Sequence, residues 1–267
     1  MNFTGVVIVG LVVGLTGLII GLLLGVAGKK FAVEVDEKEV KVRECLPGNN
    51  CGGCGFAGCD SLAKAIAAGE APVNGCPVAG PAGAAKIAEV MGVAAEEGER
   101  KVAFVKCAGT CDKTVQKYDY YGLQDCRKAA VAPGKGPKLC AYGCMGFGSC
   151  VSACQFDAIH IVNGVALVDK EKCVACGKCV ATCPNKLIEL VPVGATSIVQ
   201  CSSQDKGKAV KAACDAGCIG CKACTKVCEA EAITVENNIA HIDQSKCTRC
   251  GKCAEKCPQK IITVAQA

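Results

Sequence analysis

The sequence predicts an α+β protein with one membrane-spanning helix at its N-terminus, and three observations support this class. An uncharged run of 26 residues, 3–28, opens the chain. Cysteine makes up 26 of the 267 residues, and most cysteines lie in tight clusters with two or three residues between neighbours. The second half of the chain is a tandem repeat, and short alternating segments within it predict β-hairpins.

The uncharged run from Phe3 to Gly28 is long enough to cross a hydrocarbon core of about 30 Å as a helix. It exceeds the apolar run of about 7–15 residues in a signal peptide, and no basic residue precedes it. Residues 1–30 are therefore predicted to be a retained, single-pass membrane anchor. Because Lys29 and Lys30 follow the run, the positive-inside rule places residues 29–267 in the cytoplasm.

Residues 31–98 are predicted to be a separate four-cysteine domain. Its first part, residues 31–44, is charged and ambiguous between strand and helix, and it is interpreted as a connector. Helices are expected at Asp60–Ala68 and Ala82–Met91. The four cysteines follow a C-x2-C-x4-C-x16-C spacing: Cys51, Cys54, Cys59 and Cys76.

The remaining chain divides into two units, residues 99–195 and 196–267, which are related by a shift of 74 residues. Each unit contains a predicted β-hairpin, one centred on Asn163-Gly164 and the other on Asn237-Asn238, because these residues accept the positive φ of a tight turn. The shift superposes Cys140, Cys144, Cys150, Cys154, Cys173, Cys176, Cys179 and Cys183 on Cys214, Cys218, Cys224, Cys228, Cys247, Cys250, Cys253 and Cys257.

The cysteine runs indicate metal ligands and not disulfides, since C-x2-C-x2-C-x3-C spacing brings four sulfur atoms to one point. Three sulfurs on one such loop can reach three corners of an iron–sulfur cube. In bacterial two-cluster ferredoxins the fourth ligand is the last cysteine of the other run. Four-cysteine zinc sites show a different spacing, two C-x2-C pairs separated by about 15–20 residues. The sequence thus predicts two tandem ferredoxin-like modules with two [4Fe-4S] clusters each.

Three of these four clusters have a regular ligand set. The predicted sets are Cys218, Cys221, Cys224 and Cys257; Cys247, Cys250, Cys253 and Cys228; and Cys173, Cys176, Cys179 and Cys154. The fourth set is irregular, because Phe147 stands where Cys221 stands in the second unit. Cys140 is the expected substitute beside Cys144, Cys150 and Cys183.

Several further cysteines leave an alternative open. Cys107, Cys111, Cys126 and Cys140 could ligate an additional cluster, which would raise the expected count from five to six. Cys201 and Cys214 mirror Cys107 and Cys140 in the repeat and are interpreted as buried free thiols. No role follows for Cys45.

Composition and charge agree with a protein whose interior contains iron–sulfur clusters. The chain is 51% hydrophobic but only 4% aromatic and contains no Trp, so side chains alone give few large groups for a core. The formal charge of +5 would become about −5 with five clusters, since each cube with four thiolates carries about −2. No Lys/Arg run with interleaved aromatic residues is present, and a nucleic-acid partner is not expected.

The order of these parts resembles the B subunit of the Rnf complex, a membrane-bound ferredoxin:NAD oxidoreductase that couples electron flow to Na⁺ or H⁺ transport. The resemblance covers the whole chain and includes Leu-Pro-Gly-Asn-Asn-Cys-Gly-Gly-Cys-Gly-Phe-Ala-Gly-Cys at residues 46–59. It implies that Cys51, Cys54, Cys59 and Cys76 hold a [4Fe-4S] cluster near the membrane. It also implies that the distal modules accept electrons from soluble reduced ferredoxin, and that the partners include other subunits of the complex.

The sequence offers no catalytic residues for this chain itself. It contains no G-x-G-x-x-G after a strand and no G-x-x-x-x-G-K-[ST], so binding of a dinucleotide or ATP is not expected. His160 and His241 lie on predicted hairpin strands and are interpreted as structural. Two alternatives remain: a polyferredoxin relay subunit of another membrane complex such as a hydrogenase, and a cluster-dependent activator of a corrinoid enzyme. The lack of a recognisable cofactor domain argues against the activator.

Overall fold

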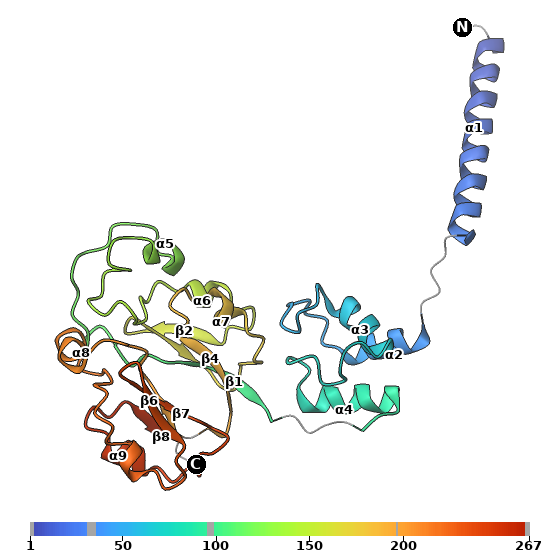
Figure 1. Cartoon of the computed structure of the whole chain (residues 1–267). Helices are drawn as coiled ribbons and strands as arrows, with labels where there is room; N and C mark the ends of the chain where they lie inside the picture. The colour runs from blue at the N-terminus through green and yellow to red at the C-terminus, as the bar shows by residue number, and fades with distance from the viewer. Residues whose placement is uncertain (1–2, 31–35, 95–98, 196, 265–267) are drawn as a thin grey trace.

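The structure is a computed structural model that describes residues 3–30, 36–94, 99–195 and 197–264. Figure 1 shows one long helix, a small helical module and a larger body of short strands and turns. The described helices are α1 (Phe3–Lys30), α2 (Glu37–Cys45), α3 (Cys59–Ala67), α4 (Gly80–Met91), α5 (Cys126–Ala130), α6 (Ser149–Ser152), α7 (Lys178–Thr182), α8 (Gly207–Ala213), the 3₁₀-helix η1 (Thr225–Val227) and α9 (Lys252–Lys256). The predicted α+β class is confirmed.

The N-terminal helix α1 has the length and composition of a membrane span. The segment Gly10–Gly28 has a mean hydropathy of 2.4 over 19 residues, and none of it is buried against the rest of the described chain. The exposed side chains include Leu11, Leu18 and Leu24. Because such apolar surface on all sides is unfavourable in water, this helix suits a lipid environment or contact with other membrane helices.

The small module packs α2, α3 and α4 around an apolar core. Leu62 and Ile66 of α3 and Ile87 of α4 are at most 1% exposed, and they pack with Val42 of α2. The two helices expected from the sequence are confirmed, with α3 beginning one residue and α4 two residues earlier than predicted.

The interpretation of residues 31–44 as a connector is wrong for its described part, because α2 begins at Glu37. The side chain of Asp36 caps this helix by accepting a hydrogen bond of 2.9 Å from the Lys38 N–H. Burial of Val42 against α3 and α4 then stabilises a segment that has little hydrophobic character of its own. Residues 31–35 lie outside the described residues.

Within residues 99–195 and 197–264, the body contains four two-stranded antiparallel sheets. Their strands are β1 (Lys101–Val105) with β4 (Ile188–Pro192), β2 (Ile159–Val162) with β3 (Val165–Val168), β5 (Ser197–Val199) with β8 (Ile262–Val264), and β6 (Ile233–Glu236) with β7 (Ile239–Ile242). The β1–β4 and β5–β8 sheets join the start of each unit to its end, from Lys101↔Pro192 in one to Ser197↔Val264 in the other. Each unit therefore closes on itself around a small core.

Both predicted β-hairpins are confirmed. Asn163 and Gly164 have φ values of 47° and 73°, and Asn237 and Asn238 have 48° and 64°. Two successive positive φ values are the signature of a type I′ turn, which joins Val162 to Val165 and Glu236 to Ile239 with only two residues between.

The two units lie in direct contact. The Ala108 N–H donates to the Gln200 carbonyl at 3.0 Å, and the Val115 N–H donates to the Ala213 carbonyl at 3.1 Å. The first bond joins the segments that directly follow β1 and β5, and the second joins Val115 to the last residue of α8. The junction between the units is thus built partly from equivalent segments of the repeat.

Candidate metal centres

Cysteine side chains gather in pockets of the body, and two of these pockets reproduce predicted ligand sets. One lies between α7 and β1, and the other lies beside η1 and β8. Their cysteines are Cys154, Cys173, Cys176 and Cys179 in the first pocket, and Cys218, Cys221, Cys224 and Cys257 in the second. In both, the fourth cysteine comes from the other run of its unit, as the spacing predicts.

The third regular set gathers near α9. Cys228 and Cys253 belong to the same apolar cluster. Burial raises the pKa of the Cys253 thiol, and the nearby Cys247 raises it further. Cys250 lies exposed on the same loop. The helix α9, which carries Cys253, contacts η1, which ends directly before Cys228. This contact brings the loop of the second run near the last cysteine of the first run.

The loops that carry these cysteines share one backbone shape. Each has two residues with positive φ, separated by one residue, at positions 146 and 148, 175 and 177, 220 and 222, and 249 and 251. These positions are related by the repeat shifts of 74 and 29 residues. Such left-handed residues turn successive backbone N–H groups toward one side of a loop, which suits an anionic group.

Backbone N–H groups also donate hydrogen bonds to cysteine sulfurs. The Ala103 N–H lies 3.3 Å from Cys173 Sγ, and the Leu187 N–H lies 3.4 Å from Cys183 Sγ. Hydrogen bonds of this kind stabilise thiolate ligands and help to set the reduction potential of an iron–sulfur site.

The irregular site obtains its fourth cysteine from an unexpected position. Its pocket contains Cys144, Cys150 and Cys183 together with Cys126, which is the first residue of α5. Burial raises the pKa of the Cys150 thiol, and the nearby Cys144, Cys126 and Cys183 raise it further. The structure therefore does not bring Cys140, the substitute expected from the sequence, to this site.

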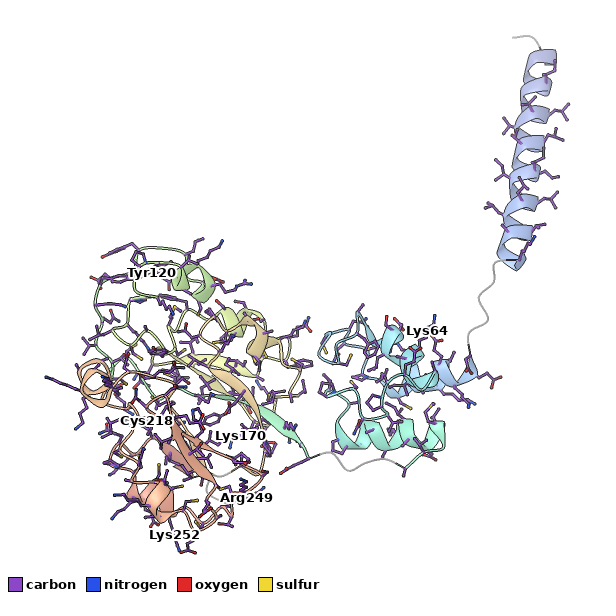
Figure 2. All side chains as sticks on the ribbon, viewed as in Figure 1. Lys64, Tyr120, Lys170, Cys218, Arg249 and Lys252 are labelled. Carbon is purple, nitrogen blue, oxygen red and sulfur yellow. The ribbon has the colours of Figure 1, made fainter. Side chains whose placement is uncertain are left out.

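The segment between Cys107 and Cys140 is 20 residues longer than its counterpart between Cys201 and Cys214. This insertion carries Cys126, and a short hydrogen-bond network joins it to the site. The Cys126 N–H donates to Ser149 Oγ at 2.7 Å, and Ser149 Oγ lies 3.1 Å from Asp125 Oδ2. Asp125 caps α5 by accepting from two backbone N–H groups. Phe147, which occupies the position of the missing cysteine, packs on Tyr120 of the same insertion, labelled in Figure 2, at a centroid distance of 5.1 Å.

The alternative set of Cys107, Cys111, Cys126 and Cys140 is not assembled. Cys111 is exposed and lies at the β2–β3 turn, where its N–H donates to the Asn163 carbonyl. Cys107 and Cys140 line a different pocket from Cys126. Cys45, the last residue of α2, is half-buried against the core of the small module.

The small module carries the predicted membrane-proximal set. Cys59 and Cys76 are buried in the core of the module, and Cys54 packs against the same cluster. The Cys59 N–H donates to Asn50 Oδ1 at 2.8 Å, which fixes the start of α3 beside the Cys51–Cys54 loop.

This loop also lies against the body, since a Cβ built on Gly53 would come within 2.6 Å of the Cys176 carbonyl oxygen. Burial raises the pKa of the Cys176 thiol, and the nearby Cys51 of the small module raises it further. The cysteine loop of the small module therefore approaches the first unit at Cys176.

Burial raises the pKa of several of these thiols when no metal is bound, which favours their protonated form. Removal from water raises the pKa of the Cys150 thiol to about 12, and that of the Cys179 and Cys224 thiols to about 11. Metal binding must displace these protons, so assembly of the sites releases protons to solvent.

The spacing of the cysteines along the chain favours a cube over a single ion. Four-cysteine zinc sites show two C-x2-C pairs separated by about 15–20 residues, which differs from the runs of this chain. Within the described ranges, no group of three or more Cys, His, Asp or Glu residues is arranged to hold one metal ion. The all-thiolate donor sets and their loop spacing are those of [4Fe-4S] sites.

The fold and its cysteine sites define an iron–sulfur protein of the polyferredoxin class. Family models match it in three places: an Fe-S cluster domain at residues 46–78, a 4Fe-4S binding domain at 166–189 and a 4Fe-4S dicluster domain at 217–261. The chain belongs to the family of the B subunits of Rnf-type ion-translocating oxidoreductase complexes, whose members are iron–sulfur electron-transfer subunits.

Three relatives establish this membership. The chain is 48% identical to the B subunit of the Na⁺-translocating ferredoxin:NAD⁺ oxidoreductase complex of Acetobacterium woodii, over 94% of this chain and 76% of the relative. It is 44% identical to the B subunit of the ion-translocating oxidoreductase complex of Methanosarcina acetivorans, over 92% and 93%. It is 43% identical to the B subunit of the proton-translocating ferredoxin:NAD⁺ oxidoreductase complex of Clostridium ljungdahlii, over 96% and 92%.

Proposed function

We propose that this chain relays electrons from reduced soluble ferredoxin into a membrane-bound ferredoxin:NAD oxidoreductase complex that transports Na⁺ or H⁺. The names of two relatives support the reaction. The observation that carries the proposal is the succession of four-cysteine sites, which runs from the C-terminal unit to the module that follows the apolar helix in the sequence.

Five ligand sets make up this succession in the proposal. Each [4Fe-4S] cluster, when bound, takes up and passes on one electron at a time. The proposed sets are Cys51, Cys54, Cys59 and Cys76; Cys154, Cys173, Cys176 and Cys179; Cys126, Cys144, Cys150 and Cys183; Cys218, Cys221, Cys224 and Cys257; and Cys228, Cys247, Cys250 and Cys253. Cys126 here replaces Cys140 of the sequence-based set, and the proposal is supported by the pocket that Cys126 and Cys150 line together.

The chain's own residues shape the path between sites. Gly53 allows the Cys51–Cys54 loop to approach the backbone of Cys176 more closely than any side chain would permit. Apolar neighbours such as Ile188 and Leu187 surround the Cys183 site and exclude water from it. Exclusion of water from a site favours transfer along the chain over loss of electrons to solvent.

The location follows from α1 and its flanking charges. We propose a single-pass helix with residues 29–267 in the cytoplasm, because Lys29 and Lys30 follow the apolar run and no basic residue precedes it. A reporter that is active only when exported, fused after Ala267, is expected to be inactive. Activity of that reporter would refute the orientation.

Ion transport, dinucleotide binding and the NAD chemistry belong in this proposal to the partner subunits. The two relatives named for Na⁺ and for protons have similar identity to this chain, 48% and 43%. The sequence of the B subunit therefore does not by itself select the coupling ion. No catalytic residue is assigned to this chain.

The test is complementation of membranes that lack this subunit. The full chain is expected to restore ferredoxin-dependent NAD reduction, whereas the full chain with Cys54→Ala is expected not to. Cys45→Ala is the matched control, since Cys45 lies in the same module but outside the ligand set. Restoration by Cys54→Ala to the level of the control would overturn the proposed role of the module.

A further inference from the structure

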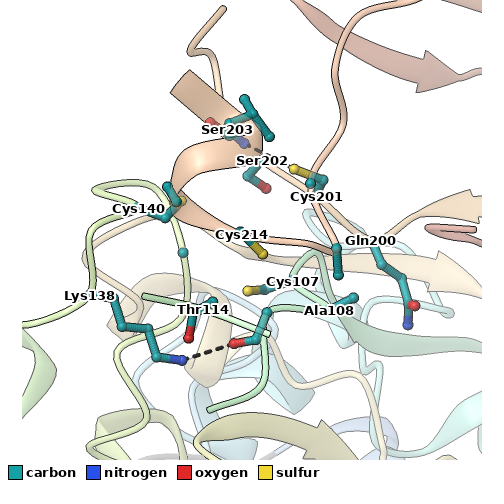
Figure 3. A pocket seen from close by; sticks show the side chains of 16 residues that line it. Cys107, Ala108, Thr114, Lys138, Cys140, Gln200, Cys201, Ser202, Ser203 and Cys214 are labelled. Atoms are coloured by element: carbon teal, nitrogen blue, oxygen red, sulfur yellow. Dashed lines mark hydrogen bonds between the residues drawn. The ribbon is translucent and has the colours of Figure 1, made fainter. Parts of the chain in front are cut away.

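Four cysteines outside the five sets share one pocket at the junction of the two units. Cys107, Cys140, Cys201 and Cys214 line this pocket, and Figure 3 shows their sulfur atoms directed toward a common space. Cys140 and Cys214 are half-buried and Cys201 is 8% exposed. All four are free thiols in the structure.

The pocket is built from equivalent residues of the repeat. Cys107 lies two residues after β1, and Cys201 lies two residues after β5. Cys140 precedes Cys144 by four residues, and Cys214 precedes Cys218 by four residues. Each unit thus contributes the same two cysteines, and neither unit holds four of them alone.

Hydrogen bonds across the junction fix the segments that carry these cysteines. Beside Cys107 and Cys201, the Ser202 hydroxyl donates to the Lys106 carbonyl at 3.1 Å. Beside Cys214, the Asp215 N–H donates to the Lys113 carbonyl at 2.9 Å. The sulfurs are therefore held by the contact between the units.

The sulfurs of this pocket accept backbone hydrogen bonds from ligand segments of two neighbouring sites. The Cys144 N–H lies 3.3 Å from Cys107 Sγ, and the Cys218 N–H lies 3.3 Å from Cys201 Sγ. The pocket therefore lies between the irregular site of the first unit and the Cys218 site of the second. N–H···S bonds favour thiolate over neutral thiol.

A buried lysine supplies positive charge beside the pocket. Lys138 is 5% exposed, and its Nζ donates to the Gly109 and Gly164 carbonyls at 2.9 Å and 3.0 Å. None of the ion pairs among the described residues includes Lys138. Since a buried cation without an acidic partner is costly, an anionic group in this pocket would balance it.

Glycines keep side chains away from the sulfurs. A Cβ on Gly109 would lie 3.3 Å from Cys214 Sγ, and a Cβ on Gly143 would lie 3.5 Å from Cys140 Sγ. The wall of the pocket at these two points is therefore backbone, as it is around cluster loops.

We propose that Cys107, Cys140, Cys201 and Cys214 bind a sixth [4Fe-4S] cluster that joins the two ferredoxin-like units. Each thiolate bonds one iron of the cube, and the four thiol protons pass to solvent on assembly. A cube with four thiolates carries about −2, which complements Lys138. The site would place a redox centre between the Cys144 and Cys218 sites.

The proposal predicts a specific metal content for the anaerobically reconstituted full chain. Six cubes give about 24 iron and about 24 acid-labile sulfide per chain, against about 20 of each for five cubes. The variant Cys201→Ala/Cys214→Ala is expected to hold about 20 of each. The control Cys45→Ala/Cys111→Ala, which changes two cysteines outside every site, is expected to retain about 24.

Several outcomes would overturn the proposal. These are about 20 iron in the unaltered chain, about one zinc per chain that is lost in the variant, or a disulfide among the four cysteines in the native protein. If the double variant does not fold, Cys140→Ala decides: the loss of one ligand is expected to add the EPR signal of an oxidised [3Fe-4S] cluster. Absence of that signal would count against the site. The iron and sulfide contents do not depend on NAD reduction, so failure of this proposal can be distinguished from failure of the proposed function.

Discussion

The irregular site of the first unit can be tested by moving its fourth ligand from position 126 to position 147. Cys126→Ala removes the thiolate that α5 supplies, and Phe147→Cys puts a thiolate at the position that Cys221 occupies in the second unit. Cys126→Ala is expected to lose between one iron, if the cube becomes [3Fe-4S], and about four, if the cluster is lost. Addition of Phe147→Cys is expected to restore the cube.

The structure indicates that the loop can accept this exchange. Gly146 and Gly148 have φ values of 81° and 78°, like the two positive-φ residues around Cys221, so the loop already has the shape of a ligand loop. Loss of the Phe147 ring removes its contact with Tyr120, at a cost of about 0.5–1.5 kcal/mol. This cost is small beside a domain stability of about 5–15 kcal/mol.

The assay is iron and sulfide content together with the Mössbauer spectrum of ⁵⁷Fe-reconstituted protein. Cys126→Ala alone should show the deficit, and the Cys126→Ala/Phe147→Cys double variant should not. The reasoning is refuted if Cys126→Ala retains every cluster, or if the double variant keeps the deficit while remaining folded.

Three further changes test other contacts. Ser149→Ala leaves the Cys126 N–H without its acceptor, which costs about 1–3 kcal/mol, and loss of iron to a chelator should become about 5- to 150-fold faster. Gly53→Ala forces a Cβ against the Cys176 carbonyl and should slow reduction of the membrane-proximal cluster in stopped-flow experiments while iron content is unchanged. Ile87→Ala, at a fully buried position, should lower the stability of the module by about 2–5 kcal/mol in denaturant titration.

The Gly53→Ala experiment has a matched control two residues away. Gly55 has a φ of 85° and no atom within 4 Å of a built Cβ, so Gly55→Ala strains the same loop without touching the body. Slow reduction in both variants would attribute the effect to the loop itself and not to the contact with Cys176. An iron-releasing effect of Ser149→Ala should likewise be absent in Ser152→Ala, whose hydroxyl donates to the Gly148 carbonyl of its own helix start.

The regular sites can be predicted because their ligands are encoded locally. The runs around Cys218 and Cys247 repeat at 29 and 74 residues, and the last cysteine of each run follows its loop at a fixed distance. The hairpins are equally predictable, since Asn163-Gly164 specifies the turn within four residues.

The remaining ligands depend on tertiary contacts that spacing does not encode. Cys126 reaches its site because the insertion is fastened to Ser149, 23 residues away. The sequence favours free thiols for Cys201 and Cys214 and another site for Cys140, because the pocket exists only where the two units meet. Their symmetric placement in the repeat is a usable signal. The helix α2 is not predicted from the sequence for a similar reason, since Val42 is buried through contacts of α2 with α3 and α4.

The order of reduction in the full chain tests the central claim most directly. Holoprotein is mixed with reduced ferredoxin and freeze-quenched, and EPR follows each cluster. The signal absent from Cys54→Ala identifies the cluster of the membrane-proximal module. If electrons enter the ferredoxin-like units and leave near the membrane, this signal should appear after the others and should be delayed further by Gly53→Ala. Its appearance before the other signals would contradict the proposed direction of electron flow.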